Sequence, residues 1–441
     1  MFILICVLIV FLFVALYSDS SYFISNYTII IPLLYIGLNI MYIRKFRKWN
    51  ILNFEFFFSL SYFLCCFLTH IVISSIDSYK ARIFLETPDT QYRTYVICMV
   101  GYLFYMLGLI YKREGDKYFS SSDIFVGKSL VQISNLICLM FILIFFIEGG
   151  KSLLTIYSSQ AVKSNRLEGW GGYLMYSMIT YTISILTNLL YIKQTSKSLL
   201  SLPKIFLLNS SILFIMLGLS GYRSNLIQLV LPLVYVYNQY YSKISNWKII
   251  VFFVLGVCFL AYSGLTRSGD MIDRNSLDVF VLVRDFVPAN AANIYLIDYA
   301  DKYGYTYGSN WIMQILSVIP FAQNIYLSLF GRADFAPYSS IFFTAEMESF
   351  NSGLGTGLVG DIYYSTGIVG VCFFMFLLGF TCNKLSNSKS SIVVTVMLLV
   401  FFGNSVFACR VEYFYIVRMI SFAAIIMWME VKISKYRTDL L

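Results

Sequence analysis

Charged residues are scarce in this chain. Only 12% of its 441 residues carry a charge, whereas in a typical soluble domain about a quarter do. Hydrophobic residues make up 59% of the sequence and aromatic residues 18%. This composition excludes a disordered chain, a nucleic-acid-binding domain and an ordinary water-soluble enzyme. We therefore expect lipid, rather than water, to be the main solvent of the protein.

Histidine is nearly absent, because His70 is the only one and it lies in an apolar run. This argues against a metal cluster and against a Ser-His-Asp triad. The nine cysteines all lie in or at the ends of apolar runs, and their spacing fits no zinc site. We interpret them as packing residues. The sequence also lacks a GxxxxGK[ST] phosphate loop, so we expect neither a metal nor a cofactor.

Long apolar runs are abundant. The sequence predicts an all-α polytopic membrane protein with about twelve transmembrane helices, since most of the runs approach the roughly twenty residues that cross a bilayer. The first run has no basic start and no small-residue cleavage site, so we interpret it as a retained helix. The twelve runs are 1–17, 22–43, 51–76, 94–111, 128–147, 171–192, 205–219, 223–241, 248–265, 362–382, 390–408 and 412–431.

The basic residues give the predicted orientation. The net charge is +9, and the loops after the even-numbered runs are all basic. Because basic loops stay on the cytoplasmic side, both termini are expected in the cytoplasm. These loops and the tail hold eighteen of the 32 basic residues: Arg44, Lys45, Arg47, Lys48, Lys112, Arg113, Lys117, Lys128, Lys193, Lys197, Lys204, Lys243, Lys248, Lys384, Lys389, Lys432, Lys435 and Arg437.

Two segments test this topology. Residues 205–241 are too long for one straight span, and we predict two short helices that turn at 220–225, where Gly221 interrupts the apolar pattern. Residues 311–330 are uncharged and long enough to span, but they contain Gln314, Pro320 and other polar residues. We predict an interfacial or re-entrant helix there, because a thirteenth span would move the later basic loops outside.

One large hydrophilic loop, 266–361, separates residues 1–265, which hold nine spans, from residues 362–441, which hold three spans and the tail. The loop has ten acidic and five basic residues, and this contrast with the basic loops indicates the extracytoplasmic side. An apolar stretch at 279–287 predicts an interfacial helix. Six aromatic residues fit either an interfacial belt or sugar stacking: Tyr295, Tyr299, Tyr303, Tyr305, Tyr307 and Trp311.

Five arginines are predicted to lie near the outer membrane boundary, where a charge requires a partner. The planar guanidinium group matches phosphate oxygens, so a cluster there suits the head group of a lipid diphosphate. The alternative is that each pairs with a neighbouring carboxylate, such as Glu412 or Asp285, or extends to the interface. The candidate binding residues are Arg223, Arg267, Arg284, Arg410 and Arg418.

Three carboxylates near the end of the large loop are candidate catalytic residues. Glu346 and Glu348 lie two residues apart, and Asp361 follows a glycine-rich run at 351–360. Glycosyl transfer needs a base that takes the proton of an acceptor hydroxyl, and a carboxylate commonly does this. The alternative for each glutamate is an acidic, solvated loop.

The run Gly353-Leu-Gly-Thr-Gly-Leu-Val-Gly360, followed by Asp361 and by Gly367 in an apolar span, resembles the bacterial O-antigen polymerases of the Wzy class. The turn Ser220-Gly221-Tyr222-Arg223 is similar to the arginine-bearing turn of that family. The number of spans, the cytoplasmic termini and the single long periplasmic loop are similar too. The Arg-x10-Gly pattern of some members is absent, so no residue role is transferred from it.

The resemblance implies a GT-C-like glycosyltransferase of the bacterial inner membrane that polymerises undecaprenyl-diphosphate-linked repeat units. Its expected partners are those lipid-linked oligosaccharides, the lipid bilayer, a chain-length regulator and a flippase of the same pathway, and no nucleic acid. The alternatives are a flippase or other transporter, whose loops are typically short, and an O-antigen ligase, which uses a histidine in the large loop. Residues 266–361 contain no histidine.

Overall fold

The computed structural model describes residues 1–16, 21–47, 49–67, 88–111, 124–147, 170–219, 223–252, 255–256, 287–319, 321–331, 336–346, 355–387 and 391–439. Throughout these ranges the regular structure is helical, and they contain no strand. The predicted all-α fold class is therefore confirmed. Helices satisfy their backbone hydrogen bonds internally, which lipid requires of any segment that crosses it.

Six helices within the described ranges are long and apolar enough to cross a membrane. The chain is therefore an α-helical membrane protein, and the full set of twelve spans stays a proposal. The six stretches are Ile29–Phe46, Thr90–Ile110, Lys128–Phe145, Tyr173–Gln194, Leu358–Asn387 and Tyr413–Tyr436. Four further apolar helices are shorter: Phe2–Leu16, Phe54–Cys66, Lys204–Gly218 and Ile392–Gly403.

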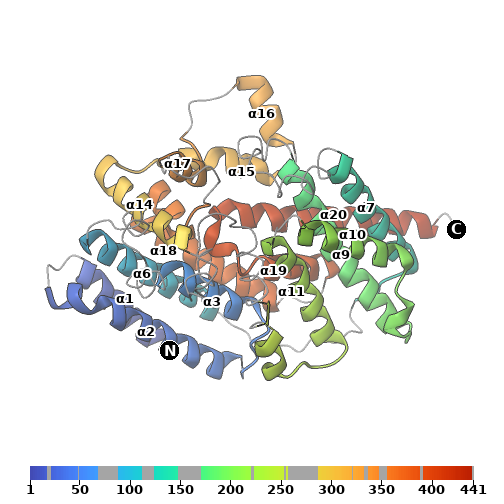
Figure 1. The fold of residues 1–441 in the computed structure, drawn as a ribbon, viewed down its shortest axis with the longest axis horizontal. Helices are drawn as coiled ribbons and strands as arrows, with labels where there is room; N and C mark the ends of the chain where they lie inside the picture. The colour runs from blue at the N-terminus through green and yellow to red at the C-terminus, as the bar shows by residue number, and fades with distance from the viewer. Residues whose placement is uncertain are drawn as a thin grey trace, which may run out of the picture. The chain divides into compact units, whose positions relative to one another are not determined.

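The chain forms two compact units, and the first combines the N-terminal helices with the large loop and its following span (Figure 1). It comprises 1–116, 275–387 and 405–416. Its elements are α1 (Phe2–Leu16), α2 (Ser21–Phe46), α3 (Phe54–Cys66), α6 (Pro88–Ile110), α14 (Val287–Tyr303), η5 (Ser309–Trp311), α15 (Ile312–Val318), α16 (Ala322–Phe330), α17 (Ser339–Glu346), α18 (Leu358–Asn387), η6 (Ala408–Arg410) and the start of α20 (Tyr413–Asp439).

Helices α6 and α18 form the tightest packing of this unit, because glycines let their backbones meet. A Cβ added at Gly379 would lie 2.0 Å from the carbonyl oxygen of Tyr105, and one added at Gly108 would lie 2.2 Å from that of Phe376. Small residues permit such close approach between helices in lipid, where the hydrophobic effect does not drive association. The crossing fixes α18, and α18 carries Asp361.

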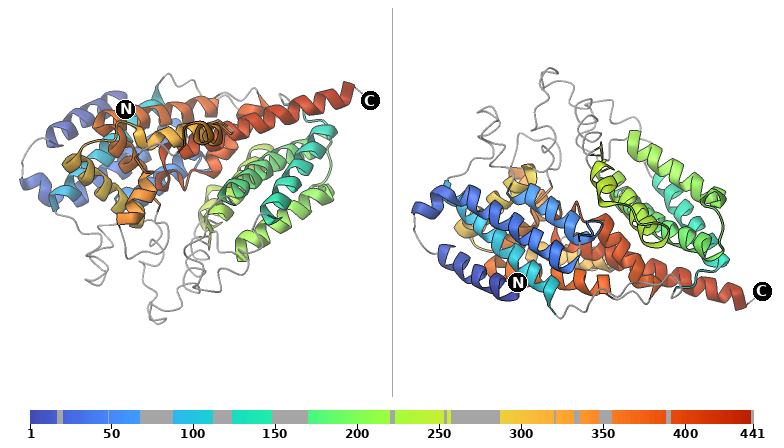
Figure 2. Two further views of the ribbon diagram at one scale, coloured as in Figure 1. Left: turned by 90° about the horizontal axis from the view of Figure 1, so that it is seen from above. Right: turned by 90° about the horizontal axis from the view of Figure 1, so that it is seen from below.

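The second unit comprises 117–274, 388–404 and 417–441. Its helices α7 (Lys128–Phe145), α9 (Trp170–Gln194), α10 (Lys204–Leu219) and α11 (Arg223–Tyr240) lie side by side (Figure 2), and α19 (Ile392–Gly403) packs on α9 and α11. The short η4 (Leu199–Ser201) and the remainder of α20 complete it.

Buried amide and hydroxyl groups join the helices of the second unit. The Asn135 Oδ1 atom of α7 accepts hydrogen bonds from Ser184 Oγ (2.6 Å) and Asn188 Nδ2 (3.0 Å) of α9. Asn209 of α10 donates to the Asn135 carbonyl oxygen at 3.0 Å, and Ser134 of α7 donates to Glu430 of α20. Such interhelical hydrogen bonds satisfy polar groups that lipid cannot.

The predicted break in 205–241 is confirmed, since α10 ends at Leu219 and α11 begins at Arg223. Segment 311–330 forms two short helices rather than one. Ile319, which precedes Pro320, has an extended backbone (φ −97°, ψ 126°), as the steric bulk of proline favours. Phe321 then has φ +66°. Neither α15 nor α16 is long enough to span a bilayer.

Some expectations lie outside the described residues, including His70, the stretch 279–286 and most of the run 248–265. The helix α14 within the large loop was not predicted from the sequence. The sequential division at 265 and 361 describes sides of the membrane and stays a prediction, whereas the compact units combine segments from all three parts.

The α6–α18 crossing yields a first prediction. Gly379→Val places a branched side chain where even an added Cβ would lie 2.0 Å from a carbonyl oxygen. Overpacked sites typically lower the unfolding free energy by about 1–3 kcal/mol, so we expect at least such a loss or failure to fold. The measurement is the unfolding temperature of the detergent-purified protein. Gly37→Val is the matched control, because nothing lies within 4 Å of its added Cβ. Equal unfolding temperatures for the two variants would contradict the packing argument.

Candidate functional site

Asp361 lies in the first turn of α18 and is completely buried. Its carboxylate accepts three hydrogen bonds from groups of the first unit. Ser339 Oγ donates to Oδ1 at 2.6 Å, and Oδ2 accepts from Trp311 Nε1 at 3.1 Å and from the Tyr413 backbone N–H at 3.0 Å. A buried carboxylate is tolerated when donors surround it in this way.

The three donors come from different elements, so Asp361 joins segments that are distant in sequence. Trp311 ends η5, Ser339 begins α17 and Tyr413 begins α20. The N–H groups at a helix start have no partner within the helix, and a negative charge there is favourable. Asp361 accepts the free N–H group at the start of α20, that of Tyr413. It also places its own negative charge in the first turn of α18.

A second carboxylate is held beside the first by the same short helix. Ser340, next to Ser339 at the start of α17, donates to Glu412 Oε1. Glu412 immediately precedes Tyr413, whose N–H contacts Asp361. The adjacent serines of α17 therefore serve two acidic residues, one from α18 and one from the start of α20.

The glycine-rich run packs directly against α14. Asn293 Oδ1 accepts the Gly360 N–H at 2.8 Å. A Cβ added at Gly357 would lie 2.0 Å from the same oxygen, so no side chain fits there. The run also meets Arg410, because the Thr356 N–H donates to its carbonyl oxygen at 3.4 Å. The described end of the motif that carries the family resemblance, 355–360, thus packs against an earlier helix of the same loop.

A kink in α18 provides another attachment for the loop. Gly367 has φ +68° and interrupts the helix, a conformation that disfavours residues with a Cβ. Just before the kink, the carbonyl oxygens of Tyr364 and Ser365 accept the N–H groups of Thr306 (3.0 Å) and Gly308 (3.2 Å). The segment that follows α14 is therefore hydrogen-bonded to α18.

Aromatic side chains of the loop mostly pack within the unit. Tyr299 of α14 contacts Phe342 of α17 (ring centroids 4.8 Å), and Phe342 stacks on Tyr364 of α18 (5.4 Å). Trp311 contacts Phe374 and Phe414. Of the six aromatic residues considered for an interfacial belt or for sugar stacking, Tyr303 and Tyr307 are exposed.

An ion pair that the sequence did not reveal is hydrogen-bonded to Tyr363, two residues after Asp361. Arg93 of α6 contacts Asp301 of α14 at 2.7 Å, and the Tyr363 hydroxyl donates to Asp301 at 2.7 Å. Arg93 Nη2 also donates to the Tyr363 hydroxyl at 3.3 Å. The only sequence signal was a charge near the start of an apolar run. Trp311 and Ser339 had no signal that distinguished them from packing or loop residues.

The predicted arginines are only partly placed. Arg410 belongs to η6 of the first unit and Arg418 to the second unit, and both are half-buried. Arg223 is the first residue of α11 and Glu346 the last of α17, but only their backbones are described. Arg267, Arg284 and Glu348 lie outside the described residues. The convergence of the five arginines therefore stays a prediction.

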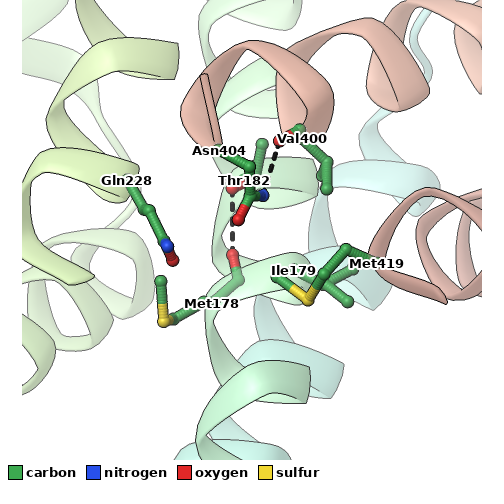
Figure 3. Close-up of a pocket in the computed structure, with 7 residues that line it drawn as sticks. All are labelled: Met178, Ile179, Thr182, Gln228, Val400, Asn404 and Met419. Carbon is green, nitrogen blue, oxygen red and sulfur yellow. Dashed lines mark hydrogen bonds between the residues drawn. The ribbon is translucent and has the colours of Figure 1, made fainter. Parts of the chain in front are cut away.

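A water-sized pocket with both polar and apolar walls lies inside the second unit (Figure 3). Polar side chains from α9, α11 and the end of α19 line it, namely Thr182, Gln228 and Asn404. Asn404 is 3% exposed, its amide nitrogen donates to the Val400 carbonyl oxygen at 2.7 Å, and its Oδ1 atom accepts no hydrogen bond from the part of the chain that the structure describes. Met419, the residue that follows Arg418 in the chain, also lines the pocket.

Comparison of the chain with family models, with curated proteins and with solved structures finds no match.

The hydrogen bonds of Asp361 yield a second prediction. Ser339→Ala and Trp311→Phe each remove one donor from a buried carboxylate, which we expect to lower the unfolding free energy by about 1–3 kcal/mol. Thermal unfolding of the purified protein measures this. Lys302→Gln is the control, because it removes the Lys302–Asp298 pair at an exposed side chain, for which about 0–1 kcal/mol is expected. Ser339→Ala and Trp311→Phe variants that both unfold like the parent would contradict the proposed role of the donors.

Proposed function

We propose that this protein polymerises undecaprenyl-diphosphate-linked oligosaccharide repeat units at the periplasmic face of the bacterial inner membrane. The observation that carries the proposal is the Asp361 site. The acidic residue of the motif that resembles the O-antigen polymerases joins the large loop to the starts of two apolar helices. A large loop that is hydrogen-bonded to the starts of these helices suits an enzyme that acts on the head groups of lipid-linked substrates.

The proposed reaction is a glycosyl transfer between two lipid diphosphates. The bond between the anomeric carbon of the growing glycan and its phosphate oxygen breaks, and a bond from that carbon to an acceptor hydroxyl oxygen forms. Undecaprenyl diphosphate leaves with the electron pair, and a carboxylate takes the hydroxyl proton. Arginines stabilise the negative charge of the leaving group, an electrostatic contribution that is often the largest in catalysis.

The surroundings of Asp361 support a role for it that differs from that of a base. Asp361 is enclosed, and three donors occupy its oxygens, so we assign it a positioning role. Glu346 is the last residue of α17, the helix that begins with Ser339, and Glu348 comes two residues later in the sequence. We therefore propose that one of these two glutamates is the base.

The glutamate proposal predicts a separable effect. Glu346→Gln and Glu348→Gln keep the size of the side chain but remove its ability to take a proton at neutral pH, and loss of a general base typically lowers a rate by about 10²–10⁴-fold. Polymer length on a lipopolysaccharide gel measures the effect, with membrane levels of the protein as the folding check. Full-length polymer in both variants would exclude these residues as the base.

The arginine proposal predicts loss of polymer in Arg223→Ala and Arg418→Ala with normal membrane insertion, because each removes a phosphate-binding fork. Lys435→Ala, an exposed residue near the end of α20, is the control and should keep normal polymer. Long polymer in both arginine variants would overturn the arginine site.

A strain that lacks only this gene tests the function as a whole. We expect its lipopolysaccharide core to carry a single repeat unit, because export and ligation continue without polymerisation. Bare core alone would instead support the flippase or ligase alternative.

A further inference from the structure

The short helix α16 presents an outward apolar face. Phe321, Ile325 and Leu329 are 76%, 55% and 70% exposed. Ile325 and Leu329 lie four residues apart on one side of the helix, and Phe321 is the residue that immediately precedes it. Within the described part of the first unit, α15 is the element that α16 packs against, and Figure 1 shows α16 projecting beyond it.

The surrounding sequence carries no charge. Between Lys302 and Arg332 every residue is uncharged, whereas a helix face that meets water usually carries several charges. A contiguous exposed apolar face marks contact with a membrane or a partner.

The same unit shows which solvent such a face meets. Helices α1 and α2 expose Ile3, Val10 and Leu33 to a similar extent, 77%, 64% and 63%. Lipid surrounds apolar helices of this kind in a membrane protein. The α16 face has the same chemistry and a similar exposure, so lipid suits it as a solvent in the same way.

We propose that α16 is a bilayer anchor of the large loop, seated with Phe321, Ile325 and Leu329 among the lipid acyl chains. Its nine residues span about 14 Å, which is too short to cross about 30 Å of hydrocarbon. The helix therefore lies in the membrane surface. Since α15 connects α16 to Trp311, the anchor holds the Asp361 site at the bilayer surface. The absence of charge makes its seating independent of anionic lipid and salt.

A depth-quenching experiment on the full chain tests the anchor. Leu329→Cys and Ile325→Cys are labelled with bimane and reconstituted in vesicles of brominated phosphatidylcholine or of the unbrominated lipid. Lys302→Cys is the matched control, because Lys302 is a charged residue of the same unit with a 61% exposed side chain. The parent chain, treated identically, gives the signal from its own cysteines.

We expect the brominated acyl chains to remove most of the fluorescence at both α16 positions and little at Lys302→Cys, with aqueous iodide showing the opposite order. Strong iodide quenching at all three positions would overturn the anchor by placing α16 in water. Protection from both quenchers would also overturn it, because a protein surface, such as a second copy, would then cover α16. None of these results depends on catalytic activity, so they are independent of the proposed function.

Discussion

Polar groups that enter lipid have to find their partners within the protein, and this constraint shapes every part of the structure. Backbone groups find theirs in helices, which is why the regular structure of the described residues is helical. Side chains find theirs across helix contacts, as Asn135 does with Ser184 and Asn188. Glycines complete the arrangement where backbones have to meet, as at Gly108 and Gly379.

The same constraint explains the Asp361 site. A carboxylate at the start of an apolar helix needs donors, and the neighbouring hydroxyl groups of α18, those of Tyr363 and Ser365, donate to other acceptors. The large loop supplies Trp311 and Ser339, and the start of α20 supplies a backbone N–H. Satisfying one acidic group therefore attaches the loop to two helices, and aromatic contacts such as Phe342 with Tyr364 extend that attachment.

The large loop has an attachment at its C-terminal end and an exposed apolar helix, α16, in its middle. Asp361 joins the loop to the helical unit, whereas α16 carries an apolar face that suits lipid. A loop held in this way is a suitable scaffold for chemistry on lipid-linked substrates, because the reacting head groups of those substrates lie at the membrane surface. The water-sized pocket of Thr182, Gln228 and Asn404 shows that the second unit also keeps polar groups away from lipid.

The sequence by itself determined the helical fold class, the ranges of most helices and the break between α10 and α11, because apolar runs, glycines and charges act locally along the chain. It also indicated Asp361 as a site residue, through the motif around it. Only the tertiary structure decided that Trp311, Ser339 and Tyr413 contact Asp361, that Arg93 pairs with Asp301, and that 311–330 folds as two helices. These partners lie about fifty to two hundred residues apart in most cases. No local pattern marks which distant donor satisfies a buried charge, since that choice depends on how the helices pack.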